Sequence, residues 1–275
     1  MPKSPLDSAI DIAVKKDVLL KNKPLQFLVK AALAGVYIGF AVVFSFTVGE
    51  YFRSAGSPAI SFMAGVAFSL ALILIVIGNG ELFTGNTMYF TMSTLKRKTT
   101  INGLVQNWIA TYIGNLIGVV FFVYLVIQSG VFSQIGLDYY LLTTAVKKVD
   151  HSTTELFFRG ILCNWLICLA IWIPMQTKDY IAKVILIMFI VTAFFVSGFE
   201  HSIANMAIFS FALSLPHAAE VTLLNTLHNL IPVTLGNVVG GGFFVGAVYV
   251  YINREVKSIS DNEKQNEVVN MKQSI

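Results

Sequence analysis

Two glutamates lie inside long apolar stretches of this sequence, and each is followed at the same spacing by an asparagine. Glu81 precedes Asn86 and Glu200 precedes Asn205, so the pattern Glu-x4-Asn occurs twice, 119 residues apart. A carboxylate within a segment that crosses a hydrocarbon layer is costly, so it usually serves a structural or transport role. The repeated pattern therefore predicts a duplicated transmembrane pore.

The composition indicates an integral membrane protein. The chain has 275 residues, of which 56% are hydrophobic and 12% are charged, whereas soluble domains carry about 25% charged residues. Six apolar stretches reach the roughly 20 residues that a helix needs to cross a bilayer. They are residues 26–49, 59–92, 103–128, 156–175, 181–213 and 229–252. We therefore predict an all-α protein whose six-span pore domain covers residues 26–253.

The ends of the chain differ from this domain. Residues 1–25 have no signal-peptide pattern, and their apolar side chains are spaced as in an amphipathic helix at a membrane surface. Anchoring at the membrane interface explains this pattern. Residues 254–275 are polar and are expected to form a disordered cytoplasmic tail.

Basic residues are distributed unevenly around the predicted spans. Fifteen of the 19 Lys and Arg residues lie on the side of the two termini, and four lie on the other side, namely Arg53, Lys147, Lys148 and Arg159. The positive-inside rule then places both termini in the cytoplasm, in a multi-pass protein of the cytoplasmic membrane. The net charge of +4 is accordingly interpreted as topology, and no nucleic-acid partner is expected. Lys16 either borders the cytoplasmic mouth or has only this topological role.

A second internal match supports the duplication. Residues 107–122 align without gaps to residues 229–244, and seven of the sixteen positions are identical, including Gly-Asn-x2-Gly and a Phe-Phe pair. The repeats then cover about residues 26–128 and 156–253. Because each repeat has three spans, the second starts on the opposite side of the membrane, which predicts an inverted 3+3 repeat. We expect Asn115 and Asn237 within this match to form hydrogen bonds between helices.

The second and fifth spans carry glycine and polar residues at their centres, at residues 78–86 and 197–202. Irregular backbone at membrane depth is tolerated where it is buried in protein or lines a wet cavity. We therefore predict that both helices are broken, and the N-termini of half-helices favour an anion. The acidic groups would repel an anion, so we expect them to be structural and to accept freed backbone N–H groups. The structural polar set is Glu81, Glu200, Asn86 and Asn205.

Three motifs resemble the formate/nitrite transporter family. They are Gly-Glu-Leu-Phe-Thr-Gly-Asn at residues 80–86, Cys-Asn-Trp-Leu-Ile-Cys-Leu-Ala-Ile-Trp at 163–172 and Ser-Gly-Phe-Glu-His-Ser-Ile-Ala-Asn-Met at 197–206, and the resemblance covers about residues 15–255. It implies an aquaporin-like protomer in a homopentamer, embedded in membrane lipid. Each protomer would have its own pore for small monovalent anions, and no cofactor is expected.

The resemblance also implies roles for individual residues. The implied pore and anion-binding positions are His201 at mid-depth, Thr84 facing it, Asn164 nearby, and Lys148, which would raise the positive potential of the pore. The implied apolar constrictions are Leu82 and Phe194 beside the histidine, and Leu72 and Phe68 on the cytoplasmic side. Lys148 would equally suit a solvated loop. The resemblance further implies that the N-terminal segment gates the pore, for which interfacial anchoring is the alternative.

The implied function is conduction of a small anion. Residues 78–89, together with Lys148, look most like the hydrosulfide-channel branch, so hydrosulfide is the first expectation and formate or nitrite the alternative. His201 would either hydrogen-bond the anion or lend it a proton. The choice between passive and proton-linked transport stays open.

Two other classes of protein fit less well. An aquaporin-type channel for neutral solutes would carry paired Asn-Pro-Ala motifs, which residues 86–88 and 205–207 lack. A membrane-embedded enzyme needs clustered catalytic groups, whereas the four histidines are scattered. The spacing of Cys163 and Cys168 suits no zinc site. The sequence therefore predicts neither an enzyme nor a metal site.

Overall fold

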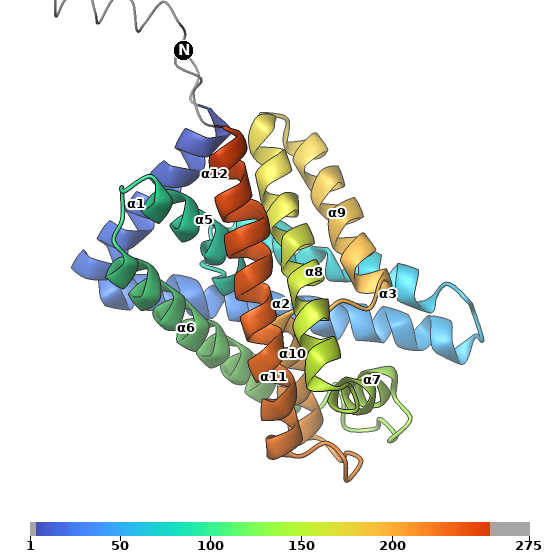
Figure 1. Cartoon of the computed structure of the whole chain (residues 1–275). Coiled ribbons are helices and arrows are strands. Elements are labelled where there is room, and N and C mark those ends of the chain that lie inside the picture. Colours follow the sequence, from blue (N-terminus) through green and yellow to red (C-terminus); the bar gives the residue numbers. More distant parts are fainter. Residues whose placement is uncertain (1–3, 254–275) are drawn as a thin grey trace, which may run out of the picture.

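The computed structural model describes residues 4–253, which form helices and connecting turns without a strand (Figure 1). The helices are α1 (Pro5–Asn22), α2 (Pro24–Ser54), α3 (Ile60–Phe68), α4 (Leu70–Ile77), α5 (Phe83–Leu95), α6 (Ile101–Gln128), α7 (Tyr140–Val149), α8 (Thr153–Trp172), η1 (Ile173–Gln176), α9 (Tyr180–Val196), α10 (Ser202–Ser214), α11 (Leu223–Val238), the π-helix η2 (Val239–Ala247) and α12 (Val248–Ile252). The all-α prediction is confirmed for this part of the chain. The predicted polar tail lies outside it.

Five helical stretches among the described residues are long and apolar enough to cross a membrane. They are Pro24–Ser54, Ile60–Ile77, Ile101–Gln128, Thr153–Gln176 and Leu223–Ile252. The shorter apolar helices α9 and α10 cover the region of the predicted fifth span.

The helical path is interrupted between α4 and α5 and again between α9 and α10. Each interruption contains a residue with positive φ, which is 59° at Asn79 and 69° at Gly198. The backbone N–H of Glu81 then donates to the carbonyl of Lys30 in α2 at 3.1 Å, and that of Glu200 donates to the carbonyl of Arg159 in α8 at 3.3 Å. The two interruptions are therefore held in the same way by different helices.

The two helices that follow the interruptions are buried almost throughout. Fully or nearly fully buried side chains include Met88 and Phe90 of α5 and Phe209 and Phe211 of α10. These 13-residue helices lie at the centre of the molecule, surrounded by longer helices. Irregular backbone at their starts is therefore enclosed by protein.

Glycines bring the surrounding helices into backbone contact. A Cβ atom on Gly35 of α2 would overlap the carbonyl oxygen of Asn115 in α6, and one on Gly236 of α11 would overlap the carbonyl oxygen of Phe157 in α8. Such close approach needs a small residue at the crossing. The pairs α2/α6 and α8/α11 thus pack alike.

Helices α1 and α7 lie at opposite ends of the molecule (Figure 1). The N-terminus of α1 is capped by Ser4, and its buried face, which includes Ala9 and Ala13, packs against α5, α2 and α6. Helix α7 packs against α10, α2 and α11. Each of the two short central helices is therefore covered at one end by a helix that carries a lysine considered below.

Candidate functional site

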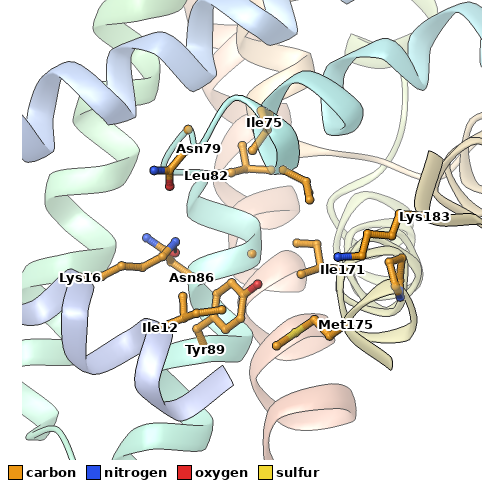
Figure 2. A pocket seen from close by; sticks show the side chains of 14 residues that line it. Ile12, Lys16, Ile75, Asn79, Leu82, Asn86, Tyr89, Ile171, Met175 and Lys183 are labelled. Carbon is orange, nitrogen blue, oxygen red and sulfur yellow. Dashed lines mark hydrogen bonds between the residues drawn. The ribbon is translucent and has the colours of Figure 1, made fainter. Parts of the chain in front are cut away.

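Two cavities and a small chamber between them run through the centre of the protein. The first, here the Lys16 cavity, has a volume of about 250 Å³ and is lined by Lys16, Asn86, Tyr89 and Leu82 among others. Figure 2 shows Lys16 reaching from α1 to Asn86 beside the ring of Tyr89. The second, the Lys148 cavity, has a volume of about 340 Å³ and is lined by side chains of α3, α7, α9 and α10.

The chamber lies between the two cavities and shares lining residues with each of them. It encloses about 10 Å³, close to the roughly 10–15 Å³ that one water molecule requires. It shares Leu82 and Ile75 with the Lys16 cavity, and Phe68 and His201 with the Lys148 cavity. Apolar side chains therefore separate each cavity from a chamber of about one water molecule's size.

The predicted constriction residues lie at this chamber or at the adjoining Lys148 cavity. Phe68 packs edge-on against Phe194, with 5.9 Å between ring centroids, and both rings line the Lys148 cavity. Leu72 lines the chamber itself. Phe68 therefore lies at the cavity opposite the one that Lys16 of α1 lines, whereas the resemblance implied a constriction on the cytoplasmic side. It lies in α3, some turns before the interruption, and so on the side where that helix begins.

His201 and Thr84 meet where the two central helices begin. His201 is the N-cap of α10, and its Nδ1 accepts the backbone N–H of Ala204 at 3.1 Å. Because that N–H can only donate, a neutral ring carries its proton on Nε2. Nε2 lies 3.1 Å from Thr84 Oγ1, so the imidazole N–H donates to the hydroxyl. His201 lines both the chamber and the Lys148 cavity.

The first glutamate–asparagine pair is bound to a lysine of α1. Lys16 Nζ lies 2.7 Å from Glu81 Oε2 and donates to Asn86 Oδ1 at 2.7 Å. Asn86 in turn donates to Glu81 at 3.3 Å and to Asn107 Oδ1 at 3.0 Å. The side chain of Glu81 is only 2% exposed, and its buried negative charge is compensated by the ammonium group of Lys16.

The second pair repeats this arrangement with a lysine of α7. Lys148 Nζ donates to both carboxylate oxygens of Glu200, at 2.8 and 2.9 Å. Asn205 donates to Glu200 at 2.5 Å and to Asn229 Oδ1 at 2.8 Å. The Glu200 side chain is 3% exposed. Lys148 does line its cavity, but its charge is paired.

The glutamates do not accept the freed backbone N–H groups that we expected. Among residues 4–253, the first N–H groups of α5 and α10 are instead bound by Asn115 and Asn237, for which we had expected only hydrogen bonds between helices. Asn115 Oδ1 accepts the N–H of Phe83 at 3.0 Å, and its amide donates to carbonyls of α2 and of Glu81. Asn237 Oδ1 accepts the N–H of Ser202 at 2.9 Å. The neutral amide offers both an acceptor and donors there, which a carboxylate does not.

Asn164 points away from the cavities. Its two N–H groups are shared among three acceptors, which are the carbonyl of Asn237 at 2.6 Å, Thr87 Oγ1 at 3.0 Å and the carbonyl of Thr84 at 3.2 Å. It is fully buried. Sequence reasoning did not assign Asn107 and Asn229, although they form the first identical pair of the aligned repeat.

The Lys148 cavity has a cationic wall. Lys147 and Arg159 line it together with Lys148, His151 is a further polar lining residue, and Glu200 is the acidic residue among the lining side chains. Tyr140 also lines it, and burial raises the pKa of this hydroxyl, which keeps it neutral. Within residues 4–253, no three His, Cys, Asp or Glu side chains are grouped to hold a metal ion. The cavity therefore suits a small anion.

Comparison with known proteins finds similarity over nearly the whole chain. The family description "Formate/nitrite transporter" matches residues 5–251. The uncharacterized transporter YwcJ of Bacillus subtilis is 41% identical, covering 88% of this chain and 94% of that protein. The nitrite transporter NirC of Salmonella typhimurium is 40% identical, with 85% of each chain covered.

Two solved structures resemble the fold. A structure titled "FNT family ion channel" has a TM-score of 0.87 at 34% identity, with 91% of this chain and 99% of that chain covered. A pentameric formate channel with formate bound has a TM-score of 0.72 at 34% identity, with 83% of this chain and 96% of that chain covered.

Proposed function

This chain belongs to the formate/nitrite transporter family, and on that basis we propose that it forms a transmembrane pore for small monovalent anions. The observation that carries the proposal is the series of Lys16 cavity, chamber and Lys148 cavity, which share lining residues, with His201 at the chamber. Family membership supports a membrane transporter, and the prediction that the chain is not an enzyme is consistent with it.

The proposed architecture has six membrane spans in an inverted 3+3, aquaporin-like repeat. Helices α3, α4 and α5 form the broken second span, and α9 and α10 form the broken fifth. Matched contacts support this symmetry, because Asn115 and Asn237 bind the starts of α5 and α10 alike. We place both termini in the cytoplasm from the distribution of Lys and Arg. A homopentamer is supported by the pentameric formate channel of similar fold.

In the proposed mechanism, the cationic wall of the Lys148 cavity attracts the anion from one side, and Lys16 and Lys183 line the cavity on the other. The ion sheds water between Phe68 and Phe194 or beside Leu82, where no polar side chain replaces the lost hydration. His201 then offers its Nε2–H, and the Thr84 hydroxyl can donate to the same ion.

His201 acts as a hydrogen-bond donor in this mechanism and not as a proton carrier. A second proton on the ring must go to Nδ1, where the N–H of Ala204 already donates. Protonation would remove this cap and place a positive charge at the N-terminus of α10, where the helix dipole disfavours it. The histidine is therefore held in the neutral state with its donor toward Thr84.

Hydrosulfide is the first candidate ion because the chamber is so small. A volume of about 10 Å³ is at the lower limit for one water molecule, so any ion must widen the chamber as it passes, and a compact ion needs the least widening. Nitrite and formate are the alternative, supported by the names of the nitrite transporter and the formate channel that this chain resembles.

Anion flux into proteoliposomes tests the proposal. Purified protein is reconstituted, and uptake of hydrosulfide, nitrite, formate and chloride is measured under one gradient, with protein-free vesicles as the control. We expect hydrosulfide to enter fastest, with the solute chemically unchanged. Faster nitrite or formate flux would identify the alternative ion, and no flux above the protein-free control for any anion would refute the pore.

A further inference from the structure

Asn164 occupies a position where the two halves of the protein differ. Asn115 donates to the carbonyl of Ala31 in α2, and Asn237 donates to the carbonyl of Gly160 in α8. Four residues beyond these carbonyls stand Gly35 and Asn164, which are therefore equivalent. The first half has no side chain at this position, and the second half has a buried amide.

The neighbouring helix differs at the matching point. In the first half, α6 continues as a regular α-helix through Asn115 to Gln128, and its backbone touches Gly35. In the second half, α11 ends at Val238 and continues as the π-helix η2. In an α-helix the carbonyl of Asn237 would accept the N–H four residues later, whereas a π-helix bond reaches one residue further.

The side-chain amide of Asn164 contacts α11 and η2 at the point where the α-helix becomes a π-helix. It donates to the carbonyl of Asn237 at 2.6 Å, and a Cβ atom on Gly241 would lie 2.5 Å from its nitrogen. The π-helix thus leaves the Asn237 carbonyl accessible to the Asn164 amide, and the missing side chain of Gly241 leaves room for that amide. A π-helical turn within an α-helix is rare and is found mostly at functional sites.

The same amide reaches the helix that carries Thr84. Its remaining N–H is shared between Thr87 Oγ1 at 3.0 Å and the Thr84 carbonyl at 3.2 Å, while the Thr87 hydroxyl donates to the Thr84 carbonyl at 2.6 Å. Asn237 in turn binds the N–H of Ser202, the residue after His201. One side chain therefore connects the two residues that form the 3.1 Å contact between Thr84 and His201.

We propose that Asn164 is a positioning residue: it binds the π-helix and α5 together and so sets Thr84 opposite His201, without contacting the anion. The donors that face the chamber are then oriented by a bridge that exists in only one half of the protein. This inference rests on the proposed function for its transport readout alone.

Nitrogen NMR of the histidine rings tests the positioning directly and needs no transport. The chain has four histidines, so selective ¹⁵N-histidine labelling gives a simple spectrum, in which His201→Asn identifies the His201 signals. We expect Asn164→Ala to shift these signals in the same direction as Thr84→Val, because both remove the oriented hydrogen bond. Asn225→Ala in the first turn of α11 is the matched control and leaves them unchanged.

Thr87→Val provides a milder variant that keeps Asn164 and the shape of its neighbour. It is expected to shift the His201 signals in the same direction by a smaller amount, and size-exclusion chromatography checks that each variant is folded. If the His201 signals match the wild type in both Asn164→Ala and Thr87→Val, the positioning role is refuted.

A double-mutant cycle on anion flux supplies the second readout. We expect Asn164→Ala and Thr84→Val each to lower flux about tenfold, and the double variant to be no slower than the slower single variant, since both act through one contact. If the wild type conducts and the double variant loses about a hundredfold in flux, the two losses multiply and the inference is overturned. A wild type without flux would instead refute the proposed pore, and the NMR comparison then decides the role of Asn164.

Discussion

Replacing Lys148 by methionine is expected to destabilise the protein much more than replacing its partner Glu200 by glutamine. In Lys148→Met the carboxylate of Glu200, 3% exposed, loses its cationic partner and keeps the amide of Asn205. Leaving such a buried charge unpaired costs about 3–5 kcal/mol. In Glu200→Gln the remaining ammonium is 14% exposed and faces a cavity of about 340 Å³ that water can enter. The glutamine oxygen still accepts from it, so the cost is about 1 kcal/mol.

Thermal unfolding in detergent measures this difference. At about 2–4 °C per kcal/mol for a chain of this size, Lys148→Met should lower the midpoint by roughly 6–20 °C and Glu200→Gln by roughly 2–4 °C. Lys147→Met, at the exposed neighbouring lysine, is the matched control and should shift it by no more than about 2 °C. The double variant with Lys148→Met and Glu200→Gln should be more stable than Lys148→Met alone, because it no longer contains the unpaired buried carboxylate of Glu200. Equal small shifts for both single variants, or a double variant equal to their sum, would refute the reasoning.

Three further predictions follow from the packing and the caps. Gly35→Ala places a methyl group against the backbone of α6, and overpacking of about 1–3 kcal/mol should lower the unfolding midpoint by several degrees. The control Gly136→Ala, at an exposed position in a surface turn, should leave the midpoint unchanged. Equal midpoints for the two variants would contradict this prediction. His201→Asn should keep the midpoint within about 2 °C, because asparagine caps a helix well, but should lower anion flux about tenfold; unchanged flux would exclude the donor role. Leu82→Ala should widen the chamber and raise formate flux relative to hydrosulfide flux, and an unchanged ratio would show that Leu82 does not restrict the path.

Much of the helical framework was predictable because its signals are local. Apolar length gave the positions of α2, α6 and α8, and the glycine and polar residues near Gly80 and Gly198 indicated where the helical path stops. The aligned Gly-Asn-x2-Gly segments predicted that Asn115 and Asn237 bind other helices. These features depend on residue type and periodicity, which a single sequence displays.

The ion pairs were not predictable in the same way. Lys16 and Glu81 are far apart in sequence, as are Lys148 and Glu200, and no spacing rule relates a residue of α1 or α7 to a helix interruption. The motif containing Asn164 likewise gave its location without the direction of its amide. That direction depends on the π-helix η2, which has no clear signal in the sequence beyond its glycines.

The paired lysines explain how a cationic path can still release an anion. At an effective dielectric constant of 20, a lone ammonium attracts an anion 4 Å away by about 4 kcal/mol, which corresponds to a nearly thousandfold longer stay. Conduction requires binding weak enough for the ion to leave. Glu81 and Glu200 compensate Lys16 and Lys148 at opposite ends of the path, so neither end holds an unpaired buried charge. Attraction is then left to the more exposed cations such as Lys147, and the oriented donors at His201 and Thr84 act only where the ion has lost its water.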